Sequence, residues 1–312
     1  MTTDARQDTA GKTMRAATVL ALAAAVISGT NNFLTKIAVT AVRDPLVYTT
    51  LKNAIVAVIL VAAVLAFRSR KEIAALRRPV LLKLLAVGAI GGSLPFALYF
   101  TGLARTSAIN AAMIHKTLFI WVLLLAAPFL KERLTRLQWL GIAATFGANL
   151  VVGGFSGFRF DGGELMILAA TVLWAVENVF AKKALQEVSS SLLAAARMGI
   201  GALILLPFAL ARGGAAAVAG LGAGQWGWTL LTSVLLLGYV VAWYAALKRA
   251  PATYVATLLV PATLVTNALT AAFVTHALPG RQLASAAMLA VGASLMIVAA
   301  RRSSPARRPA AA

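Results

Sequence analysis

The sequence has no cysteine in its 312 residues, which excludes disulfide bonds, thiolate metal sites and thiol nucleophiles. Charged residues are scarce as well: they make up 12% of the chain, against about 25% in a typical soluble domain. Acids and histidines are the scarcest of these groups, with 9 Asp and Glu and two His against 29 Lys and Arg. General acid–base catalysis and metal binding depend mainly on these residue types. We therefore expect no enzymatic activity, no cofactor and no metal.

Apolar residues are abundant instead, at 61% of the chain. Ten mostly apolar stretches of about 18–25 residues are each long enough to cross a ~30 Å hydrocarbon core as a helix. We place them at 16–39, 46–67, 79–103, 108–130, 137–155, 163–181, 189–211, 225–247, 252–274 and 281–300. The connections between them are too short for a soluble domain of ~100 residues. The sequence therefore predicts an all-α polytopic membrane protein with ten transmembrane helices.

The net charge of +20 raises the question of nucleic-acid binding, but the basic residues are unequally distributed between the two sides of the predicted spans. If the N-terminus is cytoplasmic, 20 Lys and Arg lie on that side, five lie on the other side and four lie within spans. This excess is the positive-inside pattern of membrane proteins. We therefore expect both termini in the cytoplasm, the lipid bilayer as the partner of the chain, and no nucleic acid.

The sequence also repeats itself at an offset of about 145 residues. The matched pairs are Asn31 with Glu177, Asn32 with Asn178, Lys36 with Lys182, and Lys52 with Arg197. Each half holds five predicted spans, an odd number, so the second half must enter the membrane from the opposite side. We therefore divide the chain into two five-helix repeats related by inversion, residues 1–155 and 156–312. Secondary transporters commonly have this architecture, with a substrate cavity between the repeats near the midplane.

Four segments of the first half carry a family resemblance. They are Ala97–Phe100, Thr106–Ala112, Lys131–Thr135 and Gln138–Gly141, and the last two contain a Glu-Arg-Leu-Thr and a Gln-x-x-Gly pattern. In these segments the chain resembles the EamA-type domain of the drug/metabolite transporter superfamily. The second half departs from the pattern, because His276 occupies the position of Glu132. The resemblance implies a 5+5 inverted-repeat carrier in the inner membrane of a bacterium, similar to exporters of aromatic or other neutral amino acids.

Polar residues inside spans indicate where such a carrier would bind its substrate, because a charged group at mid-bilayer is costly unless it faces a cavity or a partner. We expect Glu177 to be the single buried acid, on one helical face with Trp174 and Asn178. It would receive a substrate ammonium group or a proton. The alternative is that Glu177 lies near the membrane interface and pairs with Lys183 or Arg197.

Four cations within or near spans remain open at the level of sequence. His115 and Lys116 are consecutive and diverge by ~100° around a helix, so only one of them can point into a narrow cavity. A protonated His115 would attract a substrate carboxylate, whereas the alternatives are a helix-to-helix hydrogen bond for His115 and snorkelling for Lys116. Lys52 and Arg197 lie at symmetric depths, which fits either packing and snorkelling or gate pairing.

These arguments predict nine substrate-binding residues: Asn31, Asn32, Tyr99, His115, Trp174, Glu177, Asn178, Trp243 and Tyr254. The aromatic members would suit a flat or apolar substrate group, and core packing is the alternative for each of them. The predicted function is alternating-access export of small amphipathic metabolites, above all neutral or aromatic amino acids, by a monomer or weak dimer, with coupling to protons left open. The alternatives are a carrier of organic cations, drugs or nucleotide sugars, and a membrane scaffold that transports nothing.

Overall fold

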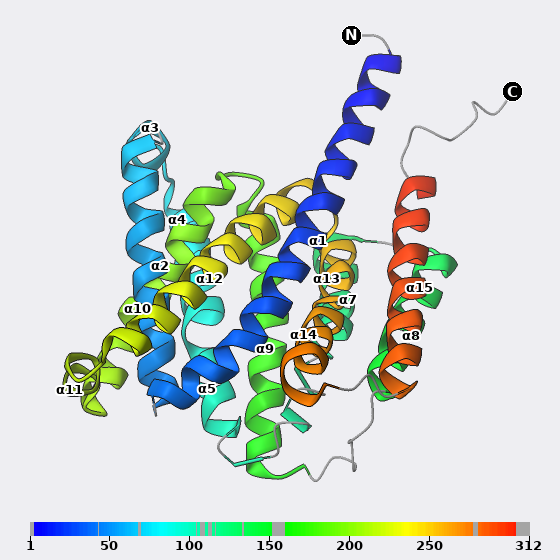
Figure 1. Cartoon of the computed structure of the whole chain (residues 1–312). Helices are drawn as coiled ribbons and strands as arrows, with labels where there is room; N and C mark the ends of the chain where they lie inside the picture. The colour runs from blue at the N-terminus through cyan, green and yellow to red at the C-terminus, as the bar shows by residue number, and fades with distance from the viewer. Residues whose placement is uncertain are drawn as a thin grey trace, which may run out of the picture.

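The computed structural model of the chain describes residues 3–42, 44–67, 70–103, 105–106, 110–111, 114–115, 117–132, 134–151, 160–276 and 280–303. Every regular element in these ranges is a helix, which confirms the all-α fold class (Figure 1). The elements are α1 (Thr3–Val42), α2 (Pro45–Phe67), α3 (Arg70–Ala74), α4 (Arg78–Gly92), α5 (Leu94–Leu103), α7 (Leu118–Leu130), α8 (Arg136–Val151), α9 (Gly162–Ala184), α10 (Ser190–Ala211), α11 (Gly214–Ala219), α12 (Ala223–Arg249), α13 (Ala252–Leu259), α14 (Ala262–Thr270), the π-helix η1 (Ala271–Thr275) and α15 (Gly280–Ser303).

Seven helical segments of the described residues are long and apolar enough to cross a membrane. They are Gly11–Thr35, Pro45–Phe67, Arg78–Tyr99, Gly162–Ala184, Ser190–Ala211, Ala223–Arg249 and Ala252–Val274, and Leu118–Leu130 and Leu283–Ala299 are shorter apolar helices. Large apolar side chains are exposed on their outer faces, among them Val58 at 69% and Leu203 at 70%. Such a surface suits contact with lipid. These helices fit a multi-pass membrane protein, and the count of ten spans stays a prediction.

Helices from the two predicted halves pack against one another throughout the bundle. Helix α1 runs along α12, α2 packs against α10, and both α4 and α5 pack against α9. Helices α8 and α15 form a further pair at the edge of the bundle, where they stand apart from most other helices (Figure 1). The central helix α9 consequently contacts helices of both predicted halves, and it carries Trp174, Glu177 and Asn178, which are considered below.

Side-chain caps explain the residue types of the family-like motif in the first half. The carboxylate of Glu132 accepts bonds from the backbone N–H groups of Ala252 and Thr253 at 2.7 and 3.0 Å, and from the Thr253 hydroxyl at 2.6 Å. Glu132 thereby holds the start of α13. Thr135 and Gln138 cap the start of α8 reciprocally, because each side-chain oxygen accepts a bond from the other residue's backbone N–H. These residues position helices, and Glu132 ties one half of the chain to the other.

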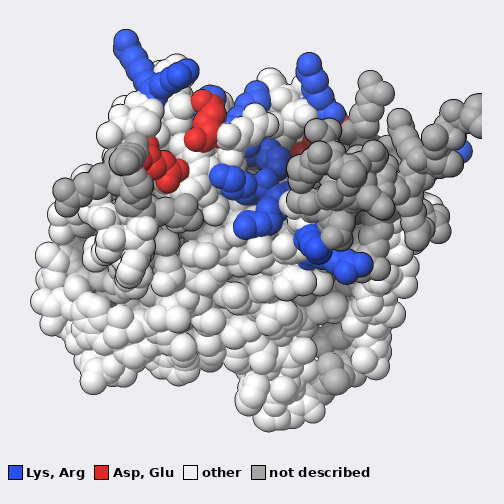
Figure 2. All heavy atoms as spheres, turned by 90° about the horizontal axis from the view of Figure 1, so that it is seen from above, with Lys and Arg blue, Asp and Glu red and all other residues white. Residues whose placement is uncertain are grey.

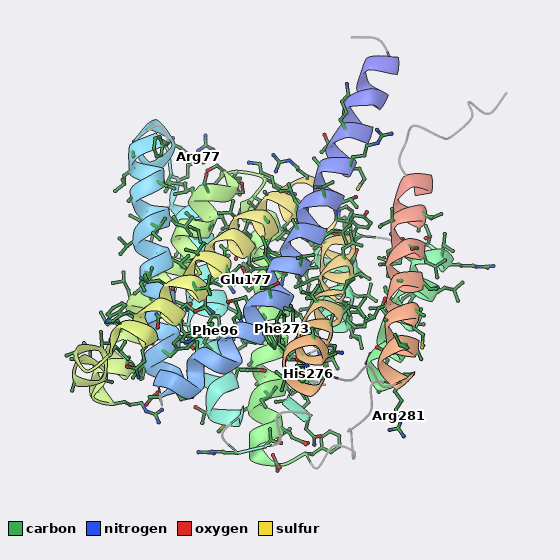
Figure 3. The ribbon with its side chains drawn as sticks, viewed as in Figure 1. Arg77, Phe96, Glu177, Phe273, His276 and Arg281 are labelled. Carbon is green, nitrogen blue, oxygen red and sulfur yellow. The ribbon has the colours of Figure 1, made fainter. Side chains whose placement is uncertain are left out.

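The start of α1 and the end of α15 lie at the same end of the bundle as α3, as Figure 1 shows. Figure 2 looks onto this end, where Lys and Arg side chains gather together with several acids. Arg77, at the start of α4, also lies there, whereas Arg281 lies at the opposite end (Figure 3). The start of α1 and the end of α15 thus lie on one side of the bundle, which agrees with the predicted topology.

This arrangement and the charge distribution together predict the outcome of reporter fusions. Fusions at Ala312 and within the loop 68–78 should fluoresce with green fluorescent protein and be inactive with alkaline phosphatase, because the charge distribution predicts that both sites are cytoplasmic. A fusion near Phe158, which lies outside the described residues, should show the reverse behaviour. An active phosphatase at Ala312 would contradict both the topology and the inversion of the second half.

Candidate functional site

The acid singled out by the sequence, Glu177 of α9, is 2% exposed and lies among three helices. Its Oε1 accepts a hydrogen bond from the hydroxyl of Tyr244 on α12 at 2.5 Å. The same oxygen lies 3.9 Å from Nε of Arg197 on α10, which is itself 9% exposed. Of the two alternative partners, Arg197 is the one observed, whereas the Lys183 ammonium lies over the ring of Phe129. Glu177 is therefore part of a buried ion pair.

Glycines bring these charged groups together. A Cβ atom at Gly91 of α4 would collide with Cγ of Glu177 and would lie 3.1 Å from Nε of Arg197. One turn deeper in α10, a Cβ at Gly201 would lie 2.5 Å from the carbonyl oxygen of Gly92 and 2.6 Å from its Cα. Only glycine permits this approach of two backbones. The contact between α4 and α10 thus presses Glu177 and Arg197 against the same short segment of α4.

An aromatic cluster lies directly beside the ion pair. We use this term for Phe96 and Tyr99 of α5, His115, and Trp174 of α9. The ring centres are 5.3 Å apart for Phe96 and Trp174, 5.7 Å for Tyr99 and Trp174, and 4.9 Å for His115 and Trp174. The Arg197 guanidinium lies 6.0 Å from the centre of the Phe96 ring, so cluster and ion pair are contiguous. Figure 3 places Phe96 and Glu177 in the middle of the bundle.

The Trp174 indole also has a fixed orientation, because its Nε1 donates to the carbonyl oxygen of Gly91 at 3.2 Å. Gly91 therefore contacts both the aromatic cluster and Glu177. Three of the nine predicted site residues, Tyr99, His115 and Trp174, are in mutual contact, and Glu177 joins them through this glycine. The arrangement presents aromatic faces, an acid and a guanidinium to one region of the protein.

Other predicted site residues make different contacts. Asn178 donates to the carbonyl oxygen of Trp174 in its own helix at 2.9 Å. Trp243 stacks on Tyr239 with ring centres 6.1 Å apart, and the hydroxyl of Tyr254 bonds to that of Thr18 at 2.8 Å. Trp243 and Tyr254 are 5% and 1% exposed and belong to the main apolar core, in keeping with the packing alternative. Asn32 is exposed, and Lys116 lies outside the described residues.

Asn31 belongs to a second polar cluster, formed between α1 and α2. The ammonium of Lys52, a residue 6% exposed, donates to Oδ1 of Asn31 and to the hydroxyl of Thr35, each at 3.1 Å. The offset of about 145 residues matches Asn31 with Glu177 and Lys52 with Arg197. Each half thus contains a buried contact between the cation and its matched polar partner. Lys52 and Arg197 are also placed alike, seven residues after the first residue of α2 and of α10.

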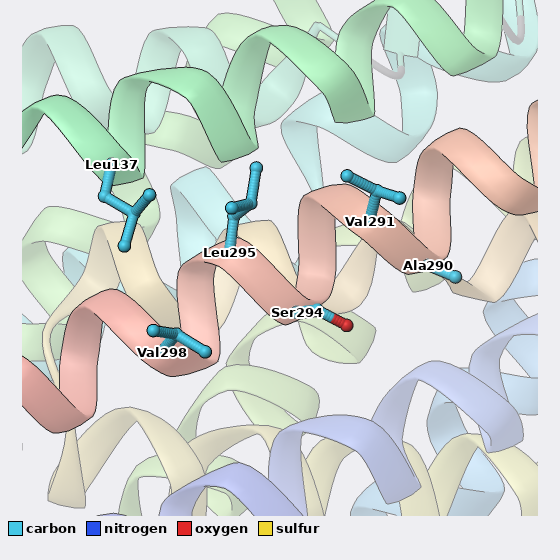
Figure 4. Close-up of a pocket in the computed structure, with 6 residues that line it drawn as sticks. All are labelled: Leu137, Ala290, Val291, Ser294, Leu295 and Val298. Carbon is cyan, nitrogen blue, oxygen red and sulfur yellow. The ribbon is translucent and has the colours of Figure 1, made fainter.

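A groove on the protein surface lies elsewhere. It has a volume of about 410 Å³ and runs between α8 and α15, where Leu137, Ala290, Val291, Ser294, Leu295 and Val298 line it (Figure 4). Its lining is apolar apart from Ser294, and neither Glu177 nor the aromatic cluster contributes to it. Such a groove at the edge of the bundle suits a lipid chain better than a polar solute.

A profile of the EamA-like transporter family matches the chain twice, over residues 15–154 and 161–299. The chain belongs to this family. Its members are transporters, so the protein is a membrane transporter, and the expected absence of enzymatic activity agrees with the family.

Two further similarities place this EamA-like transporter among known proteins. It is 30% identical over 154 residues to the "Uncharacterized transporter YyaM" of Bacillus subtilis (strain 168). That alignment covers 46% of this chain and 50% of YyaM, so the chain spans about half the length of this curated relative. A crystal structure with 19% identity superposes with a TM-score of 0.74 over 92% of this chain and 99% of that one. At this identity the second likeness shows the fold alone.

The structure of the transporter also corrects the expectation of a single buried acid. Glu164, in the first turn of α9, is 2% exposed. Its two carboxylate oxygens accept bonds from the Asn110 side chain at 2.6 Å and from the backbone N–H of Phe160 at 2.8 Å. Acids are favoured at helix starts, where they accept hydrogen bonds from backbone N–H groups. The position of Glu164 just before a long apolar run was therefore the sequence feature that could have predicted its burial.

Three further contributors to the site were absent from the nine predicted residues. Arg197 was signalled by its repeat match with Lys52, but sequence alone did not choose between packing and pairing. Tyr244 lies 145 residues after Tyr99, the same offset, and this match was the missed signal. Nothing in the sequence marks Phe96 as a site residue, because an apolar side chain on an apolar helix can equally well face lipid or a binding site.

Proposed function

We propose that this protein exports small amphipathic metabolites, above all neutral or aromatic amino acids, by alternating access around Glu177. The observation that carries the proposal is the contiguity of the aromatic cluster with the buried pair of Glu177 and Arg197. Flat aromatic faces favour apolar or planar substrate groups. An acid and a guanidinium beside them provide one group of each sign for a zwitterion.

The geometry of the ion pair supports a zwitterionic substrate. The separation of 3.9 Å between Oε1 of Glu177 and Nε of Arg197 exceeds that of a hydrogen bond. Within the described part of the chain, Nε of Arg197 has no hydrogen-bond partner. A substrate ammonium on Glu177 and a substrate carboxylate on Arg197 would give each buried charge a direct, charge-assisted bond. An organic cation is the second candidate, because Glu177 and the aromatic cluster suit a positive charge, but Arg197 would repel it.

We further propose that the chain is a ten-helix carrier built from two inverted five-helix repeats. The two matches to the family profile and the corresponding contacts Asn31–Lys52 and Glu177–Arg197 support this architecture. Inverted repeats exchange conformations, so one of the two polar contacts would loosen as the other tightens. Only the second contact contains an acid, and we therefore assign substrate charge recognition to it. In this proposal the protein resides in a bacterial inner membrane as a monomer or weak dimer, with both termini cytoplasmic.

Transport by the purified protein in liposomes tests the proposal. Radiolabelled neutral and aromatic amino acids, organic cations and nucleotide sugars are offered one at a time, with and without a pH gradient, and protein-free liposomes are the control. We expect uptake of at least one neutral or aromatic amino acid and no uptake of simple organic cations. A dependence on the gradient would identify protons as the coupling ion. Transport of none of the amino acids, in sealed vesicles with correctly oriented protein, would make the substrate assignment wrong.

A further inference from the structure

A second cavity lies at the end of the bundle that holds the start of α1 and the end of α15, separate from the site around Glu177. Its volume is about 330 Å³, and the ends of α7 and α9 and one residue of α4 form it. The lining residues are Lys83, Phe129, Leu130, Lys131, Glu132, Lys182, Lys183 and Gln186. Four of these eight residues are lysines and one is an acid, so the lining has a strong excess of positive charge.

Existing contacts neutralise only part of this charge. Both carboxylate oxygens of Glu132 already accept bonds from the start of α13. The ammonium of Lys83 pairs with Glu187, and that of Lys182 donates to two backbone carbonyl oxygens at the end of α12. Among the described residues, no hydrogen bond or ion pair involves the ammonium groups of Lys131 and Lys183. The helix dipole favours lysines at helix C-termini even where no ligand binds. This preference does not account for a cavity that lies between the lysines.

The cavity also has an apolar wall that continues to the outer surface. Phe129 is 58% exposed, and its ring centre lies 5.6 Å from the Lys183 ammonium. Leu124, further along α7, is 55% exposed as well, so this helix has an apolar surface that leads away from the lysines. Positive charge at a helix end above an exposed apolar surface is the arrangement that suits a phospholipid at the edge of a bilayer.

We propose that this cavity binds the phosphate group of an anionic phospholipid, with Lys131 and Lys183 as its ligands and the lipid chains along the outer surface of α7. Charge complementarity favours an anion, and the continuity with exposed apolar side chains favours a lipid over a soluble phosphate compound. The site does not depend on the identity of the transported substrate, and bound lipid would hold the ends of α7 and α9 together.

Lipid binding to the detergent-purified full-length protein tests this site. Phosphatidylglycerol and phosphatidylcholine are titrated separately, and retained lipid is counted by native mass spectrometry. The variant Lys131→Gln/Lys183→Gln is compared with Arg77→Gln/Arg78→Gln, which removes two charges from the same end of the bundle outside the cavity. A lysine near anionic lipid contributes a factor of about five in affinity, so the first variant should bind phosphatidylglycerol roughly 25-fold more weakly. The second variant should bind it like the wild type.

Further arms separate the possible outcomes. Lys131→Arg/Lys183→Arg keeps the charge and should retain phosphatidylglycerol, which shows that loss in the Gln variant is not a failure to fold. Inorganic phosphate in excess should displace little of the lipid, because it lacks the apolar part. If the Lys131→Gln/Lys183→Gln and Arg77→Gln/Arg78→Gln variants lost phosphatidylglycerol equally, the lipid would be held by the general positive charge of this surface. That result would overturn the proposed site. Equal retention of phosphatidylcholine, or complete displacement by phosphate, would overturn the assignment to an anionic lipid.

Discussion

Glu177→Gln should reduce transport by about 10-fold or more and should lower the free energy of unfolding by roughly 3 kcal/mol. Glutamine retains an oxygen that accepts the hydrogen bond from Tyr244, but it removes the charge that faces Arg197. A guanidinium buried without its partner is costly, because its charge has been taken out of bulk water and no longer faces a carboxylate. Transport should fall because, under the proposed function, the substrate ammonium no longer has a carboxylate to bind.

A double-mutant cycle separates the structural part of this effect from the transport part. In Glu177→Gln/Arg197→Gln the two amides are neutral, so stability should recover most of what the single variant loses, whereas transport should stay low. Glu164→Gln is the matched control, since it replaces another acid of α9 that is also 2% exposed. It should leave transport per folded molecule unchanged. Wild-type transport with an unchanged pH profile in Glu177→Gln would show that the acid serves packing alone.

Gly201→Ala should destabilise the protein by about 1–3 kcal/mol, with loss of transport in the fraction that folds. Its Cβ would lie 2.5–2.6 Å from three backbone atoms of Gly92, and backbone atoms at a helix crossing have no room to move aside. The shift between α4 and α10 would also displace Arg197, whose carbonyl oxygen would collide with a Cβ at Gly92. The unfolding midpoint in detergent and transport in liposomes measure the two effects.

Gly199→Ala provides the control on the same helix, two residues away. Its Cβ would meet only a methyl group of Val61 at 3.7 Å, which is an ordinary contact. Alanine favours a helix over glycine by about 1 kcal/mol, so this variant should be as stable as the wild type or more stable. Equal unfolding midpoints for the two variants would contradict the close crossing of α4 and α10.

The class of the protein followed from local properties of the sequence. The length and hydropathy of its apolar stretches specify membrane helices, because each must satisfy its backbone hydrogen bonds within itself. The offset of about 145 residues matched Asn31 with Glu177 and Lys52 with Arg197. In the structure Asn31 contacts Lys52, and Glu177 contacts Arg197. Sequence comparison could align these residues across the halves, but it could not decide whether Glu177 pairs with Lys183, with Arg197 or with neither.

The pairing of Glu177 with Arg197 depends on how the helices are rotated about their axes and on how closely they cross. A polar or aromatic side chain on an apolar helix is equally compatible with lipid, a neighbouring helix or a cavity, because the sequence around it is apolar on every side. The glycine contacts at positions 91, 92 and 201 decide that Glu177, Arg197 and Trp174 converge. Tertiary packing likewise placed Tyr254 against Thr18 in the core. The order of amino acids shows which residues are unusual for a membrane helix, whereas the helix crossings establish which of these residues meet.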